Sequence, residues 1–438
     1  MRVFLMGLAA LVVATSSASA QYGAMPASFA QPGYLQPAYT LSSYDDEKPM
    51  PPAPGKEGAQ THPAPIPADD YHAHGGYAPQ GCGTYGGAPC PGAAGCGDCG
   101  YGEGCNCDPG FGFAYGPSYG CWLISASGLI MTRDSDDPLW TSFDANQINS
   151  HLLGSPDVDP DDWQGGFEVT IARRLGANSG ISATYWGLDP DDNSRTITDA
   201  AGLIDSAVDF NRLDFAIGGP VNVLFDSAQA HRMSMSSEFH NVEVSLHHQM
   251  TDPCRRLSLN WLAGFRFFRF SEDLEFATSN NSTSFGVDRA NEAYYNIDVE
   301  NNLIGFQIGA RADYQASCRC SLYADTRFGI FYNDIDHNSS LTSGTGEVAV
   351  DQIYGLPWQI GSNGDEFATL AQVDVGLQYH INCCWSAHIG YRLVAASGVA
   401  LATDQVPQFV SDYYGIQDIN SNGHLFLHGG VAGLSYSF

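Results

Sequence analysis

The sequence predicts an all-β protein: a transmembrane antiparallel up-and-down β-barrel of about ten strands, preceded by a disordered Pro/Gly/Cys-rich segment. Three observations support this class. From Cys121 onward the apolar residues recur every second position, over stretches longer than usual strands. The connections between these stretches alternate between short and long. The chain also begins with an export signal.

The first twenty residues have the composition of a secretory signal peptide. Arg2 supplies the positive charge, Val3 to Val13 form the apolar stretch, and small residues precede Gln21. We therefore expect residues 1–20 to be a signal peptide, 21–118 a disordered periplasmic segment, and 119–438 the barrel. The 21–118 segment is rich in Pro and Gly and has too few aliphatic residues to form a core.

The disordered segment contains six cysteines between Cys82 and Cys107. An exported chain with cysteines in an even number is expected to be mostly oxidised. The irregular spacing favours disulfides over a zinc site. This segment could be self-stapled, or it could be a tether that crosslinks to an envelope partner.

Ten stretches alternate as half-buried strands do. In "FATLAQVDVGLQYHI", Phe367, Val373 and Ile381 fall on one face, and Gln372 and Asp374 fall on the other. The predicted strands are 121–132, 164–173, 179–188, 237–250, 257–270, 302–315, 320–332, 366–381, 385–396 and 424–438. The segment 189–235 contains "PVNVLF" and could add a hairpin, which would make twelve.

The polar face of these strands distinguishes a barrel from a soluble β-sandwich. A solvated face is ordinarily rich in Lys and Glu, but beyond residue 118 the chain has 39 acidic and 15 basic residues, and every basic one is arginine. Isolated charges among Gly, Ser and Gln fit a lumen in which opposite charges pair. A lumen of ten strands is expected to be narrow or plugged. The predicted lumen charge network consists of Glu168, Glu243, Arg266, Arg311, Asp313, Asp325, Arg327, Asp374 and Arg392.

Connections and aromatic residues predict the orientation. Long loops are expected at roughly 134–163, 189–235, 272–300, 333–365 and 397–423, on the outer side of the membrane. One aromatic belt is expected near the short turns. A second belt is expected near the long loops. Its expected members are Trp163, Phe268, Phe270, Phe331, Tyr332 and Phe367.

The last strand ends in an aromatic residue. Leu434, Tyr436 and Phe438 share one face of a strand that must close the barrel against the first. The same three residues resemble the C-terminal signal that barrel-assembly machinery reads.

Cysteines within the barrel all fall at its predicted periplasmic end. The disulfide candidates are Cys121, Cys254, Cys318, Cys320, Cys383 and Cys384. Neighbouring turns are spaced more widely than a disulfide permits, so turn-to-turn bridges can form only if the turns lean together. Pairing to the cysteine-rich tether is the alternative.

The formal net charge of −30 excludes nucleic acid as a partner. Acidic runs crowd the predicted mouth, and Asp157, Asp159, Asp161 and Asp162 are candidates for weak Ca²⁺ or Mg²⁺ binding. Loose screening by cations is the alternative. We expect no other cofactor.

One region resembles a known family. In "SSEFHNVEVSLHHQ" and "RLSLNWLAGFRFFRFSEDLEF", the residues Ser237, Glu238, His240, Glu243, Leu262, Ala263, Gly264, Phe265, Arg266, Glu272 and Asp273 match its pattern. The chain resembles the putative beta-barrel porin family of planctomycete-type outer membranes over about residues 119–438. This resemblance implies an outer-membrane barrel and no particular substrate.

Several functions remain open from sequence. The barrel, embedded in outer-membrane lipid, could have a structural or surface-binding role or be a small cation-preferring channel. An adhesin crosslinked through the tether is an alternative. A rim hydrolase is a third, with Asp334, Asp336 and His337 as its residues. We expect the protein not to be an enzyme.

Overall fold

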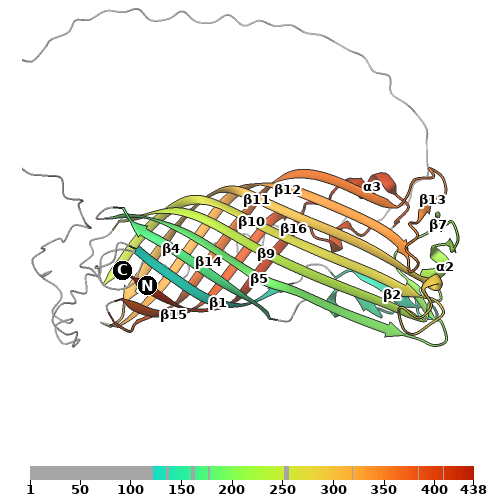
Figure 1. Ribbon diagram of the computed structural model, residues 1–438, viewed down its shortest axis with the longest axis horizontal. Helices are drawn as coiled ribbons and strands as arrows, with labels where there is room; N and C mark the ends of the chain where they lie inside the picture. Colours follow the sequence, from blue (N-terminus) through green and yellow to red (C-terminus); the bar gives the residue numbers. More distant parts are fainter. Residues whose placement is uncertain are drawn as a thin grey trace, which may run out of the picture. The chain divides into compact units, whose positions relative to one another are not determined.

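The computed structural model describes residues 122–134, 138–158, 163–175, 178–250, 256–317, 319–382, 384–407 and 409–438. Ten antiparallel strands close into one barrel (Figure 1). In chain order they are β1 Trp122–Asp134, β4 Gln164–Arg174, β5 Ser179–Thr198, β9 Ala230–Gln249, β10 Leu257–Ser279, β11 Glu292–Gln315, β12 Cys320–Ser343, β14 Gln359–His380, β15 Trp385–Val399 and β16 Gly423–Ser437. The predicted ten-stranded barrel is confirmed.

The first and last strands close the barrel. β1 pairs with β4 on one side and with β16 on the other. The backbone N–H groups of Trp122 and Phe438 each donate to the other residue's carbonyl oxygen over 3.0 Å. The chain therefore leaves no unpaired edge along this seam, as a hydrocarbon environment requires.

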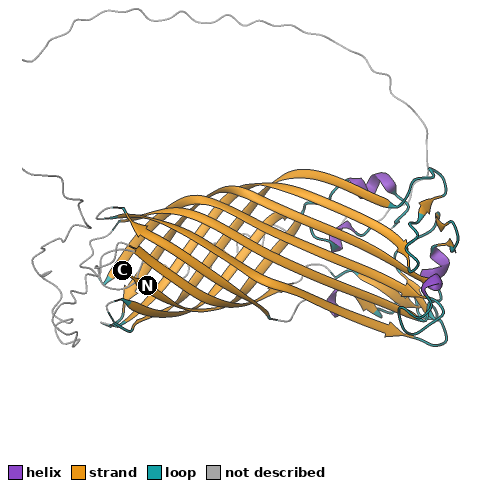
Figure 2. Ribbon diagram, viewed as in Figure 1, coloured by secondary structure: helices purple, strands orange, loops and turns teal. Residues whose placement is uncertain are grey.

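Short and long connections separate to opposite ends of the barrel. The C-terminus lies at the end with the short turns (Figure 1). The other end carries the segments 138–158, 199–229, 280–291, 344–358 and 400–422, which we call the cap. Short strands and helical turns form it (Figure 2). They are β2 Trp140–Asp144, β3 Leu153–Gly154, η1 Ser155–Asp157, β6 Ile204–Ser206, β7 Leu213–Phe215, β8 Gly219–Pro220, α2 Asn222–Phe225, η2 Arg289–Asn291, β13 Val350–Asp351, η3 Thr403–Gln405 and α3 Tyr413–Gln417.

The twelve-strand alternative is wrong. The "PVNVLF" segment forms part of β8 and the short helix α2, and its Leu224 and Phe225 are buried in the cap. Because this apolar run is buried in the cap core, it does not form a lipid-facing strand of the barrel wall. Within the described residues, no helix has the length and apolar character needed to cross a membrane.

A belt of outward apolar side chains surrounds the half of the barrel near the short turns. On β11, Ile304, Phe306 and Ile308 are 45%, 74% and 67% exposed. The intervening residues on this strand, such as Gln307, point inward and are buried. Apolar side chains outside and polar ones inside are the arrangement that a lipid environment selects.

Beyond the belt the same strands reverse this arrangement. On β11, Asp298 is exposed on the outer face, while Ile297 and Val299 are buried inside. The two-residue alternation continues, but the outer face now meets water. Five expected long loops are consequently shorter than predicted, because β1, β5, β9, β10, β11, β12, β14 and β15 extend into them. The loss of outward apolar residues marks the edge of the lipid, and the strands continue past it.

The predicted signal peptide and the Pro/Gly/Cys-rich segment, residues 1–118, lie outside the described residues.

Candidate functional site: the filled lumen and the cap

The polar face of the belt strands forms an ion network in the lumen. The structure places eight of the nine candidate charges in ion pairs: Glu168, Glu243, Arg311, Asp313, Asp325, Arg327, Asp374 and Arg392. Each comes from a position whose two sequence neighbours face the lipid, so the alternation itself positions them.

Arg392 joins three strands. Its Nη1 lies 2.7 Å from Glu168 Oε2 on β4, and its Nε donates to Asp374 Oδ1 over 2.8 Å. Asp374 lies directly opposite Arg392 on the neighbouring strand β14. The guanidinium is almost fully buried and also lies over the ring of Trp186, 5.8 Å from its centroid.

A second set of pairs lies across the lumen around Arg327 on β12. Its Nη1 donates to Glu243 Oε2 on β9 over 2.8 Å, and its Nε donates to Asp325 Oδ1 over 3.1 Å. Arg311 binds Asp313 on its own strand over 3.1 Å. Because β9 and β12 are separated by two strands in the sheet, the Arg327–Glu243 pair braces the barrel across its interior.

Arg266 is the exception among the candidate charges. It is fully buried opposite Glu243, and its Nε donates to Asn241 Oδ1 over 2.6 Å. Its two terminal amino groups have no hydrogen-bond partner among the described residues. Asn241 was not among the predicted residues, although it shares the inward parity of Glu243.

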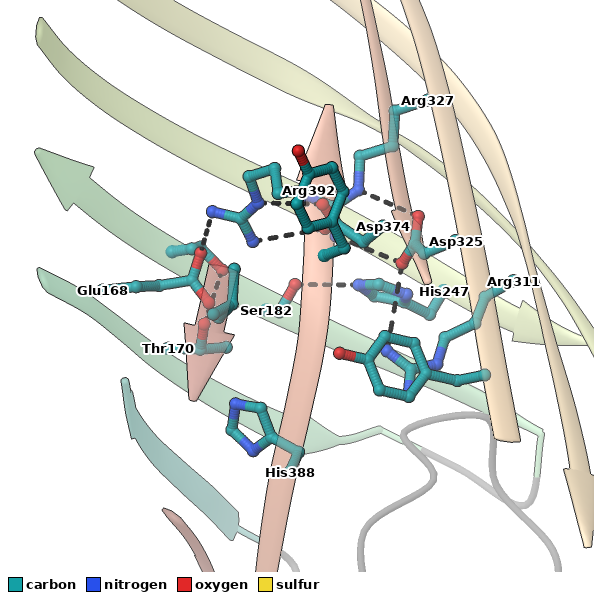
Figure 3. Close-up of a pocket in the computed structure, with 14 residues that line it drawn as sticks. Glu168, Thr170, Ser182, His247, Arg311, Asp325, Arg327, Asp374, His388 and Arg392 are labelled. Atoms are coloured by element: carbon teal, nitrogen blue, oxygen red, sulfur yellow. Dashed lines mark hydrogen bonds and ion pairs between the residues drawn. The ribbon is translucent and has the colours of Figure 1, made fainter. Parts of the chain in front are cut away.

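A small polar cavity lies within the network (Figure 3). Its volume is about 80 Å³, which suits a few water molecules and falls short of the 300–1,000 Å³ of typical small-molecule sites. His247, close to the cavity, hydrogen-bonds Ser182 Oγ over 2.8 Å. Its lining residues include Glu168, Thr170, Ser182, His247, Arg311, Asp325, Arg327, Asp374, His388 and Arg392.

An apolar layer, the seal, closes the lumen next to the network. Every barrel strand except β4 contributes to it. Phe239 and Phe270 stack with centroids 4.9 Å apart, and Trp186 packs against Phe268 with centroids 5.9 Å apart. The members are Leu129, Met131, Trp186, Leu188, Phe239, Phe268, Phe270, Leu303, Phe331, Ala368, Leu370, Val394, Ala396, Val399, Leu401, Leu425, Leu427 and Val431.

The seal corrects one sequence prediction. Phe268, Phe270 and Phe331 were expected in the lipid-facing belt, but they are at most 1% exposed and point into the lumen. Tyr332 and Phe367 do face outward. The sequence did contain a signal for this. Phe268 and Phe270 alternate with the same period as the inward residues Arg266 and Glu272, so they lie on the same face of the strand.

The last residue of β15 and the three residues after it fold into the lumen, and we call this segment, residues 399–402, the plug. Residues 399–402 are almost fully buried. Asn301 Nδ2 donates to Ala400 O over 2.8 Å, and Ala400 N donates back to Asn301 Oδ1 over 2.8 Å. Glu272, which is ion-paired with Arg133, accepts a hydrogen bond from Ala402 N over 2.8 Å. These buried polar groups fix the segment in one position.

The cap has its own apolar core above the plug. Phe210 stacks on Phe225 with centroids 3.9 Å apart, and Trp358 and Ile416 are buried with them. Inward residues of the extended strands, such as Phe276, complete this core. The lumen is therefore filled by side chains from the ion network through the seal and plug to the cap.

The remaining candidate residues are placed as follows. Leu434, Tyr436 and Phe438 face outward in the belt and are 49%, 37% and 52% exposed. Cys320 and Cys384 carry free thiols, so the part of the chain that the structure describes contains no predicted disulfide. The other four candidates, Cys121, Cys254, Cys318 and Cys383, lie outside the described residues.

The acidic candidates for a cation site are only partly described. The Asp157 carboxylate accepts a hydrogen bond from Gly154 N over 3.1 Å. Asp159, Asp161 and Asp162 lie outside the described residues. Among the residues that the structure does describe, no group of three or more His, Cys, Asp or Glu is arranged to hold a metal ion. The cation site remains a prediction.

The rim-hydrolase residues do not come together as a catalytic pair. Asp334 is exposed and Asp336 is half-buried on the outer face of β12, whereas His337 is 1% exposed on the inner face. Its Nδ1 hydrogen-bonds Ser362 Oγ over 3.1 Å, and burial lowers the pKa of His337 to about 4. The strand alternation separates these side chains by the thickness of the wall.

A known family matches most of the barrel. A family model described as "Putative beta barrel porin-7 (BBP7)" matches residues 126–417. The chain belongs to this family. No curated protein sequence matches the chain.

Solved structures similar to this BBP7 barrel are outer-membrane proteins. One is the outer membrane protease OmpT from Escherichia coli, with 10% identity, a TM-score of 0.39, and coverage of 72% of this chain and 96% of that one. Another is a major outer membrane protein from Thermus thermophilus, with 11% identity, a TM-score of 0.28, and coverage of 72% and 99%. A third is the toluene transporter TodX from P. putida, with 10% identity, a TM-score of 0.28, and coverage of 73% and 91%. The family, together with the outward apolar belt of the barrel, assigns this BBP7 chain to the outer membrane, embedded in its lipid.

Proposed function

We propose that this BBP7 barrel is a closed membrane anchor that displays its cap at the cell surface, in a structural or surface-binding role. The observation that carries the proposal is the continuous filling of the lumen. Paired charges, the seal and the cap core succeed one another along the barrel axis, and the plug residues contribute to both the seal and the cap core. A diffusion pore needs a water-filled path through the barrel. Here aromatic side chains of the barrel strands occupy that path.

Planar-bilayer recordings of the purified full-length protein test this proposal. We expect no stable conductance steps, because every member of the seal except Leu401 is a strand side chain, which cannot move aside as a loop can. Stable, large steps from the wild-type protein would contradict it. Heat-modifiable mobility on gels serves as the control that the inserted protein is folded.

A small cation-preferring channel is the second candidate. The acidic balance of the cap favours it, since the cap segments 199–229, 344–358 and 400–422 contain ten acidic residues and one arginine. Small steps whose reversal potential in a salt gradient indicates cation selectivity would support this candidate over the closed anchor. Anion-selective steps would contradict both.

A crosslinked adhesin would extend the anchor role. Cys320 and Cys384, both half-buried near the short turns, have free thiols. The thiolate of either can attack a disulfide of the cysteine-rich segment, which forms a new disulfide and releases one sulfur of that segment as a thiol. We propose that this pairing supplements the anchor, with an envelope partner reached through residues 21–118. Non-reducing gels of native envelopes should show crosslinked species that reductant removes, and a clean monomer would refute this version.

Assembly is proposed to use the C-terminal face. Leu434, Tyr436 and Phe438 lie outward on β16, next to the seam with β1, where assembly machinery could read them before closure. Deletion of Phe438 should lower the yield of folded barrel in outer-membrane fractions while refolding in detergent remains possible.

The rim-hydrolase alternative has little geometric support, and His337→Ala should leave every hydrolytic activity of the preparation unchanged.

A further inference from the structure

Apolar side chains are exposed on the outer surface of the cap, away from the lipid belt. We call six of them the distal patch: Ile217, Ile353, Tyr354, Leu356, Phe409 and Tyr414. Their exposed fractions run from 40% for Leu356 to 94% for Ile217. They come from three segments that are far apart in the sequence.

Direct contacts join these three segments. The rings of Tyr354 and Tyr414 meet edge to face with centroids 6.2 Å apart. Phe409 lies in a bridge with Asp209, and Val350 pairs with Asp214 in the sheet that β13 forms with β7. The cap elements β7, β13 and α2 lie together at the far end of the barrel (Figure 1). The patch is thus one neighbourhood of the cap.

The backbone under the patch is fixed by buried polar contacts. The Asp351 carboxylate, which is fully buried, accepts hydrogen bonds from Ile353 N and Tyr354 N over 2.8 Å each. Arg212 Nη2 donates to the other oxygen of Asp351 over 3.2 Å. The turn therefore presents Ile353 and Tyr354 outward without needing to be ordered on binding, which lowers the entropic cost of association.

A similar device presents Tyr414. Asp412 caps the short helix α3 by accepting a hydrogen bond from Gly415 N over 3.2 Å. The preceding aromatic, Tyr413, packs against buried Trp358 with centroids 6.0 Å apart. With Tyr413 turned toward the core, Tyr414 is left 68% exposed.

Charge around the patch selects its partner. Asp209, Asp214, Glu347 and Asp412 belong to the same three segments, and Arg212 is their single basic residue and is bound to Asp351. We call these four acidic residues the acidic rim. A second copy of this chain would place one acidic rim against another, and an anionic bilayer would be repelled in the same way. A cationic polypeptide would find complementary charge at the rim and apolar contact in the centre.

We propose that the distal patch docks a cationic polypeptide that carries an apolar or aromatic centre. This inference rests on the proposed surface-binding function and names the class of partner. The aromatic pair Tyr354 and Tyr414 forms the centre of contact, and the acidic rim speeds encounter and fixes orientation.

The experiment uses the full-length barrel in maltoside micelles and three synthetic probes. The first is an amphipathic Lys/Leu/Trp peptide, the second the same peptide with Glu for Lys, and the third an oligolysine of equal charge. Fluorescence anisotropy measures binding, with empty micelles as the blank. We expect the first probe to bind at least tenfold more tightly than the other two, and more weakly as salt increases.

Two variants locate the binding. Ile353→Ser/Tyr354→Ser/Tyr414→Ser should weaken binding of the first probe by tenfold or more. Its matched control, Ile148→Ser/Val287→Ser, removes exposed apolar residues elsewhere in the cap and should bind as the wild type does. Asp209→Asn/Asp412→Asn keeps a capping side chain at 412 and should weaken binding severalfold at low salt only.

Equal binding to the triple variant and the wild type would overturn the proposal, as would equal binding of the acidic probe. Binding of a neutral oligosaccharide in place of the cationic probe would overturn it in favour of a glycan. Heat-modifiable mobility verifies that each variant is folded. Conductance is a separate readout, so an open wild-type channel would overturn the closed-anchor function and leave the docking result standing by itself.

Discussion

Arg133 on β1 and Glu272 on β10 form an ion pair inside the barrel, where both side chains are almost fully buried between the seal and the cap core. The guanidinium also lies over the ring of Phe270, 5.4 Å from its centroid. The carboxylate holds the plug through Ala402 N. One pair thus connects the first strand, a strand on the far side of the lumen and the plug.

Glu272→Gln should destabilise the folded barrel by about 3–5 kcal/mol, because it leaves a buried guanidinium without its counter-charge. The matched control is Glu275→Gln on the same strand. Glu275 pairs with Arg232 on the outer face of the barrel, where both side chains are partly exposed. That change should cost about 0–1 kcal/mol. Unfolding by urea in detergent, followed by tryptophan fluorescence, measures both. Equal costs would show that the inner pair contributes no more than a surface one.

The outer face of β11 should respond to an added charge according to its height along the barrel axis. Ile308→Arg places a guanidinium in the lipid belt and should cost about 2–4 kcal/mol in a bilayer. Asn296→Arg changes the same outer face above the belt, opposite Glu275, and should change the stability by about 0.5 kcal/mol or less. Refolding yields into vesicles give the comparison. If both variants cost the same, the lipid boundary that we assign is in the wrong place.

Gly398 should be intolerant of any side chain. Its φ is +78°, and a Cβ there would overlap the carbonyl oxygen of Phe367. Gly346 has a φ of +88° with open space around it. Alanine costs about 1–2 kcal/mol at both positions for the backbone conformation. Overlap at Gly398 should add about 1–3 kcal/mol.

Proteolysis of the cap is the readout for this comparison. Gly398→Ala should expose the plug to cleavage near residues 399–402, whereas Gly346→Ala should not. Identical digestion patterns would show that the plug does not depend on this turn.

The cap should lose stability in acid through His231. Ser142 Oγ–H donates to its Nδ1 over 2.7 Å, and its Nε2–H donates to Phe225 O over 3.1 Å. Burial lowers the pKa of His231 to about 3, against an ordinary value of 6.5. The unfolded cap therefore binds the proton first. The contribution of neutral His231 to the free energy of unfolding is fully present above pH 6.5. It falls as pH drops from 6.5 toward 3, by up to about 1.4 kcal/mol per pH unit.

His231→Gln should flatten the pH dependence of cap unfolding in that window, while lowering stability at neutral pH. His424→Gln alters an exposed histidine on β16 and should leave the profile parallel to that of the wild type. Hydrogen exchange of α2 and β9 amides across pH measures the slope. A slope that His231→Gln leaves unchanged would assign the acid sensitivity to other groups.

Much of the wall could be read from residue order, because alternation is a local property. The pairing of Arg392 with Asp374 follows from adjacent strands with matching parity, and the seam between Trp122 and Phe438 follows from the need to leave no edge in lipid. The contacts of Glu243 with Arg327 could not be read in this way. They depend on which strands face one another across the lumen and on how far apart those strands are. The alternation of residues along one strand carries no information about either.

The sequence by itself determined that strands of period two wrap into a barrel with charges inside. Only the tertiary structure decided where lipid ends and water begins, since Asp298 and Ile308 occupy the same face of one strand and differ only in height. It also decided that Phe268 and Phe270 seal the lumen. Parity alone allows an inward aromatic residue at that height, but whether such rings meet in the middle depends on the diameter that ten closed strands impose.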